Sequence, residues 1–141
     1  MYLDTCYIAK FYLNEADSSA VRELVQGAGK IYSSVWALAE FHGVLHGRVR
    51  EGAMSSLEAG ELAARFGAHA RAGLWNFIPV SEALLRRTGM LMISCPREVF
   101  LRTADAVHLA TAQELGEQEI WTNDRHVLAA APYFGLTGSS V

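Results

Sequence analysis

The chain of 141 residues has little cysteine, no long apolar run and no excess of positive charge. Its two cysteines, Cys6 and Cys95, are far apart and form no CxxC motif, which argues against a disulfide scaffold and a thiolate zinc site. No stretch approaches the ~18 consecutive apolar residues that a membrane-spanning helix needs. The first residues lack the basic and apolar regions of a secretion signal. We therefore expect a cytoplasmic protein that works in a reducing compartment.

The formal net charge is −3, with 12 lysine and arginine residues against 15 aspartate and glutamate residues. Proteins that coat nucleic acid usually carry a basic surface, because lysine and arginine neutralise the phosphates. The charge balance therefore argues against such a role. A small acidic site edged by arginines remains compatible with this composition, since arginine is the better bidentate partner of phosphate.

Strand and helix patterns alternate along the chain, whose 51 % apolar residues are enough for the core of one domain over residues 1–141. Short apolar runs predict strands at 1–3, 30–33, 75–80 and 119–122, with a weak fifth strand near 136–140. Helical spacing and capping residues predict helices at 5–13, 18–27, 35–50, 55–73, 103–115 and 125–131, and one more that begins at 81. The alternation predicts an α/β fold, in which helices cover a mostly parallel sheet of four or five strands.

Only four aspartates occur in the chain, and two of them, Asp4 and Asp124, lie at or just past the ends of predicted strands. In open α/β sheets, ligands bind outside the carboxyl ends of the strands, so both side chains stand where a site is expected. Each also has a plain structural interpretation as the N-cap of the helix that follows. The sequence alone leaves both interpretations open.

Two further acids, Glu40 and Asp105, lie within apolar helical segments. Glu40 belongs either to a solvated helix face or, if its helix is covered, to a pair or a metal site, because burying a lone charge is costly. Asp105 is the only acid in a helix turn of small and apolar residues, and it is also explained as a first-turn aspartate that the helix dipole favours.

Together these acids supply four carboxylates from four segments that one cleft can collect. Carboxylates without histidine or thiolate partners are hard oxygen ligands that suit Mg²⁺ or Mn²⁺. A divalent ion would offset their mutual repulsion and activate a water molecule for attack on a phosphodiester. The pattern therefore favours a metal-dependent nuclease.

The segments around the four acids resemble the PIN-domain family, in particular the VapC-type toxins of prokaryotic toxin–antitoxin pairs. The matching segments are 2–5, 39–41, 102–112 and 122–128. The most specific of them is 102–112, which reads Arg-x-x-Asp-Ala-x-His-Leu-Ala-x-Ala. One departure is Cys6, because the family often has serine or asparagine two residues after its first acid.

The resemblance implies a three-layer α/β/α sandwich and an endoribonuclease that uses Mg²⁺ or Mn²⁺ and metal-activated water to cleave RNA. It also implies a homodimer that forms a heterotetramer or larger assembly with a cognate antitoxin, whose tail enters the active-site groove. The catalytic and metal-binding acids of the family map onto Asp4, Glu40, Asp105 and Asp124. Residues expected to contact RNA or the antitoxin are Thr5, Arg102, Thr122 and Arg125.

The sequence also allows other interpretations. His42 and His46 have the i, i+4 spacing of zinc ligands, but Gly43 stands where an HExxH motif has glutamate, which favours a surface position or an RNA contact. His108 is expected to bond the backbone or Asp105 rather than to act as a general base. An aspartyl-phosphate phosphatase would need a second aspartate at position 6, which is cysteine. A PIN-fold binding module that acts through a protein partner, with little nuclease activity, stays open as the alternative function.

Overall fold

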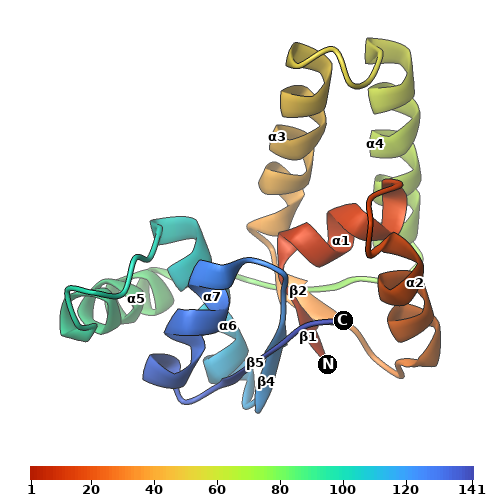
Figure 1. The fold of residues 1–141 in the computed structure, drawn as a ribbon. Coiled ribbons are helices and arrows are strands. Elements are labelled where there is room, and N and C mark those ends of the chain that lie inside the picture. The colour runs from red at the N-terminus through yellow and green to blue at the C-terminus, as the bar shows by residue number, and fades with distance from the viewer.

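The five strands pair in parallel throughout and follow the order β3-β2-β1-β4-β5 across the sheet (Figure 1). They are β1 (Tyr2–Leu3), β2 (Tyr32–Ser34), β3 (Asn76–Ile78), β4 (Glu119–Trp121) and β5 (Thr137–Ser139). This computed structural model describes all residues from 1 to 141. The chain starts in the centre of the sheet, builds outward through β2 and β3, and then returns to the other side of β1. The topological switch point therefore lies between β1 and β4.

Helices cover both faces of the sheet, which confirms the α/β/α sandwich (Figure 1). The helices are α1 (Thr5–Tyr12), α2 (Ser18–Gly27), α3 (Ala37–Arg50), α4 (Ser56–Arg71), α5 (Glu82–Ser94), α6 (Thr103–Leu115), α7 (Arg125–Ala130) and the 3₁₀ helix η1 (Ala131–Phe134). In Figure 1, α3 and α4 form a hairpin that projects beyond the carboxyl ends of the strands. None of these helices combines the length and apolarity needed to cross a membrane.

Two apolar cores lie on opposite faces of the sheet, and the first strand contributes one residue to each. Leu3 packs in the core formed with α1 to α4, whereas Tyr2 packs in the core formed with α5, α6 and α7. Both side chains are fully buried. This arrangement follows from the alternation of successive side chains along a strand and from a parallel sheet covered on both faces.

Most predicted elements are confirmed, and the differences occur at their ends. The helix at 103–115 has the predicted bounds, and Ser55 forms a capping box with Glu58 at the start of α4. The predicted helix at 35–50 begins two residues later, because the Ser34 hydroxyl accepts a bond from the Trp36 amide before the helix starts.

Asp17 holds the N-cap position of α2 without a capping bond from its side chain. Its carboxylate instead accepts from the Lys10 ammonium at 3.0 Å and from the Asn123 amide at 2.8 Å. The strand predicted at 30–33 is found at 32–34, and the one predicted at 75–80 is limited to 76–78. The weak fifth strand is present at the edge of the sheet.

Gly138 in β5 permits the close approach of this strand to α7. A Cβ at this position would lie 3.0 Å from the Leu128 Cα and 3.2 Å from its carbonyl oxygen, which are backbone atoms. We expect Gly138→Ala to lower the free energy of unfolding by about 1–3 kcal/mol, through overpacking. Urea denaturation measures the change. Gly43→Ala, in a helix and with nothing near its Cβ, is the matched control and should raise stability by up to ~1 kcal/mol. Equal stability of the two variants would contradict this account.

Candidate active site

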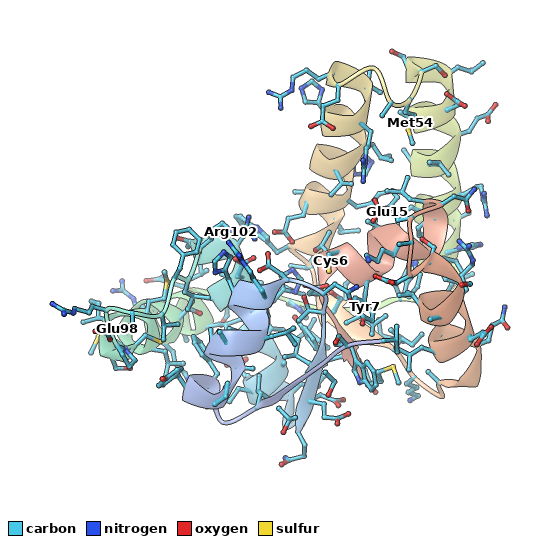
Figure 2. The ribbon with its side chains drawn as sticks, in the orientation of Figure 1. Cys6, Tyr7, Glu15, Met54, Glu98 and Arg102 are labelled. Atoms are coloured by element: carbon cyan, nitrogen blue, oxygen red, sulfur yellow. The ribbon has the colours of Figure 1, made fainter.

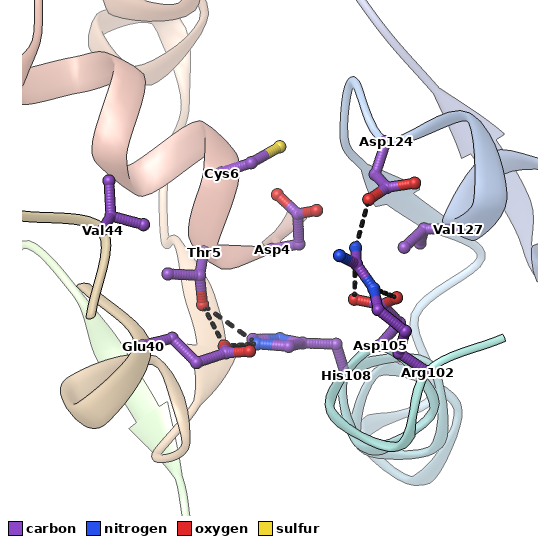
Figure 3. Close-up of a pocket in the computed structure, with 10 residues that line it drawn as sticks. All are labelled: Asp4, Thr5, Cys6, Glu40, Val44, Arg102, Asp105, His108, Asp124 and Val127. Carbon is purple, nitrogen blue, oxygen red and sulfur yellow. Dashed lines mark hydrogen bonds and ion pairs between the residues drawn. The ribbon is translucent and has the colours of Figure 1, made fainter. Parts of the chain in front are cut away.

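A pocket of about 180 Å³ lies at the carboxyl ends of β1 and β4, and all four predicted acids line it (Figure 3). Asp4 follows β1 and Asp124 precedes α7 just after β4, whereas Glu40 and Asp105 lie in the first turns of α3 and α6. The other lining residues are Thr5, Cys6, Val44, Arg102, His108 and Val127. The sheet thus places the acids at its topological switch point, where open α/β sheets bind their ligands.

Asp4 is the most deeply placed of the acids, with 6 % of its surface exposed. It caps α1, because Oδ1 accepts from the Tyr7 amide at 3.1 Å, and its Oδ2 accepts from the Thr122 hydroxyl. Burial raises the pKa of this carboxyl, although bonds from Cys6 and Thr122 oppose the rise. A cation placed beside Asp4 would therefore favour the ionised form.

Thr122 connects the two aspartates that follow the central strands. Its hydroxyl donates to Asp4 and accepts from the Asp124 amide at 2.9 Å, and the residue is completely buried. The expectation that Thr122 contacts RNA or the antitoxin needs correction, since neither its surface nor its hydroxyl is free. Asp124 itself caps α7, because Oδ1 accepts from the His126 amide at 2.7 Å.

Glu40 turns toward the pocket, and only 25 % of its side chain is exposed. Its carboxylate accepts from the Thr5 hydroxyl at 2.5 Å and from His108 Nε2 at 2.8 Å. Burial by itself would raise the pKa of Glu40, but the bond and charge of His108, with the bond from Thr5, bring that pKa below its usual value. Glu40 is therefore an ionised carboxylate at neutral pH.

His108 bonds Glu40 and not Asp105, which corrects the sequence interpretation. Its Nε2 faces the acceptor oxygens of Glu40, and its Nδ1 lies 3.0 Å from the Tyr2 hydroxyl. Asp105 is already engaged by Arg102, three residues before it. The buried imidazole therefore connects the centre of the sheet to the pocket. The i, i+3 spacing places Asp105 and His108 on one face of α6, but it does not reveal that Glu40 on α3 is the partner of His108.

The Arg102 guanidinium lies between two of the acids (Figure 3). Nε donates to Asp105 Oδ2 at 2.8 Å, and Nη2 donates to Asp124 Oδ2 at 2.5 Å. The bonds and charge of Asp105, and then those of Asp124, raise the pKa of Arg102 above its ordinary value. Figure 2 shows Arg102 on the side of α6 and α7, with Cys6 across from it on α1.

The remaining candidates lie outside the acidic cluster or differ from it in chemistry. Arg125 is exposed, its guanidinium bonds the His126 ring, and it does not line the pocket. His42 and His46 line a separate hollow between α3 and α4. Burial and the charge of Asp4 raise the pKa of the Cys6 thiol, so this side chain is protonated at neutral pH and is a poor ligand for a hard cation.

The donors in the pocket fit a hard divalent cation by their chemistry. They are carboxylate oxygens from four segments, set against one guanidinium in a part-buried site. No three histidine, cysteine or acidic side chains lie close enough to hold one ion as they stand. Binding an ion there would require the carboxylates of Asp105 and Asp124 to reorient away from Arg102.

The model of the PIN domain family matches residues 1–132. The chain belongs to the PIN-domain family. A curated relative of this PIN domain, Ribonuclease VapC46 from Mycobacterium tuberculosis (strain ATCC 25618 / H37Rv), is 34 % identical over 138 residues, which are 96 % of this chain and 93 % of the relative. The resemblance noted in the sequence is thereby confirmed, and it places this PIN domain in a family that includes VapC-type ribonucleases.

Two solved structures share the fold of this PIN domain. The crystal structure of Mycobacterium tuberculosis VapC20, a Sarcin-Ricin loop cleaving toxin, has a TM-score of 0.73 at 18 % identity, over 92 % of this chain and 93 % of that one. The structure of FitAB bound to an IR36 DNA fragment has a TM-score of 0.71 at 15 % identity, over 99 % and 93 % of the two chains. These likenesses establish the fold.

The Thr122 bridge should contribute to the stability of this PIN domain. Thr122→Val keeps the shape of the side chain but leaves Asp4 without one donor and the Asp124 amide without its acceptor. We expect a loss of about 2 kcal/mol in the free energy of unfolding, since bonds to charged groups are the stronger ones. Thr88→Val is the control, because this buried hydroxyl bonds only the Leu84 carbonyl within its own helix. A loss no larger than that of the control, in urea denaturation, would argue against the bridge.

Proposed function

We propose that this PIN domain is a metal-dependent endoribonuclease that hydrolyses RNA phosphodiester bonds and serves as the toxin of a type II toxin–antitoxin pair. The observation that carries the proposal is the convergence of four acidic side chains from four separate segments on one pocket. The 34 % identity to Ribonuclease VapC46 over most of both chains supports RNA as the substrate.

The residues that would hold Mg²⁺ or Mn²⁺ are Asp4, Asp105 and Asp124, together with Glu40. A divalent ion at this site would supply Lewis acidity, which acidifies water and neutralises the charge that develops on the phosphate. Hydrogen bonds within the chain orient these side chains. Asp4 and Asp124 are oriented by the amides of the helices that they cap and are held in register by Thr122.

Glu40 is the acid best placed to accept a proton or to orient the attacking water. The bonds from Thr5 and His108 fix its carboxylate and keep it ionised, as a general base must be. Thr5 thus acts on Glu40, with its hydroxyl already committed. Arg102, 56 % exposed at the edge of the pocket, is the cation nearest to the acids and suits a phosphate oxygen pair.

Substitution of single acids tests the catalytic assignment. Asp105→Asn removes one charge and one candidate ligand from the pocket, and we expect RNA cleavage in Mg²⁺ to fall by roughly a hundredfold or more. Asp17→Asn is a matched control, because Asp17 pairs with Lys10 outside the pocket. Cleavage of labelled RNA on gels, with EDTA as a second control, gives the measurement. Activity that survives both Asp105→Asn and EDTA would overturn the proposal.

We also propose a cognate antitoxin as the partner of this domain, with a tail that enters the acidic pocket. The pairing of Arg102 with Asp105 and Asp124 shows that the pocket accommodates a guanidinium. A basic side chain from another protein would meet the same carboxylates. The expected assembly is a heterotetramer or larger, built on a homodimer of this chain.

The apolar face of α5 is the proposed surface of that homodimer. Met90 and Ile93, three residues apart on the helix, are 70 % and 83 % exposed. Exposed apolar residues that gather in one region are typical of subunit interfaces. A second copy of the chain would remove them from water.

Charge placed on this face should separate the two copies. We expect the wild-type chain to have the mass of a dimer in light scattering, and Ile93→Glu to shift it to the mass of a monomer, because a carboxylate at the interface is costly to bury. Leu57→Glu is the control, since Leu57 is 74 % exposed on α4, away from this face. A dimer that persists in Ile93→Glu but dissociates in Leu57→Glu would place the interface elsewhere.

A further inference from the structure

Arg102 occupies the position between Asp105 and Asp124 that a cation shared by these acids would take. It is the only arginine or lysine that lines the pocket. Besides the two shorter bonds, its Nη2 lies 3.4 Å from Asp105 Oδ1, so both oxygens of Asp105 face the guanidinium. Figure 3 shows the guanidinium in this position, with dashed lines to both carboxylates.

The remaining oxygens offer little room for a second cation. Asp124 Oδ1 already accepts from the His126 amide, and its Oδ2 accepts from Arg102. Mg²⁺ needs oxygen ligands at about 2.0–2.1 Å, and it would repel a guanidinium bound to the same two oxygens. Arg102 and a metal ion therefore compete for Asp105 and Asp124.

The ion pairs that hold Arg102 in place are ones that a competing cation can replace. Its side chain is 56 % exposed, and its recorded bonds are only those to the two acids. Although Arg102 holds the N-cap position of α6, its side chain makes no capping bond. Ion pairs that are partly exposed contribute little free energy, so a divalent ion can displace one without unfolding the helix.

We propose that Arg102 is a resident counter-ion, which holds Asp105 and Asp124 together in the metal-free protein and must be displaced before a divalent ion binds both. The inference rests on the proposed metal-dependent function and deepens it. Once displaced, the guanidinium stays tethered at the edge of the pocket, where its planar fork is free to bind a substrate phosphate. The binding of the metal ion and the binding of RNA are then coupled through the Arg102 side chain.

Metal affinity tests the competition directly, without reference to activity. Calorimetric titration with Mn²⁺ should show that Arg102→Gln binds the ion roughly three- to tenfold more tightly than the wild type, because no guanidinium has to be displaced. Arg125→Gln is the matched control, with the same loss of charge close to the site but no bond to an acid. Its affinity should stay within about twofold of the wild type.

A second measurement uses the unaltered chain. In protein labelled with ¹⁵N, the Arg102 Nε–H resonance should shift as Mg²⁺ is added and should saturate together with metal binding. If Arg102→Gln binds Mn²⁺ no more tightly than the wild type, and the resonance stays unchanged in Mg²⁺, Arg102 is a permanent structural partner and the inference is overturned. If the wild type binds neither ion, the proposed metal dependence fails first and the inference fails with it.

Discussion

The constraint on which this site depends is the gathering of negative charge at the N-termini of helices. Asp4 and Asp124 are N-caps of α1 and α7, while Glu40 and Asp105 occupy the first turns of α3 and α6. Four helices thus begin at one pocket and direct their positive dipole ends and free amides toward its carboxylates. This placement stabilises acids that would otherwise repel one another, and it leaves their remaining oxygens for a cation.

The same constraint explains why two interpretations of the aspartates competed in the sequence. An N-cap and a metal ligand both need a short acidic side chain between a strand and a helix. Asp4 shows that the roles are compatible, because one oxygen accepts from the Tyr7 amide while the other faces Thr122 and the pocket. Local pattern was therefore sufficient to find Asp4 and Asp124 and their capping role, whereas a metal-binding role stays a proposal.

The features that the sequence did not reveal are contacts between distant segments. The fold class, the bounds of α6 and the identity of the four acids follow from periodicity, capping residues and the family resemblance. By contrast, Glu40 meets His108 across 68 positions, and Thr122 meets Asp4 across 118. Asp17 makes no capping bond with its side chain for the same reason, since Lys10 and Asn123 are brought to it by the tertiary fold. Helix and strand propensities depend on residues that are close in the sequence, so they do not report contacts between distant segments.

The short first strand has a consequence for how the sequence can change. Tyr2 enters one core, Leu3 enters the other, and Asp4 and Thr5 immediately enter the pocket. Because side chains alternate between the faces of a strand, a shift of one residue would send each apolar side chain into the wrong core and withdraw the first acid. Insertions and deletions are therefore forbidden in this segment, whereas the α3–α4 hairpin, which projects beyond the sheet, has room to vary in length.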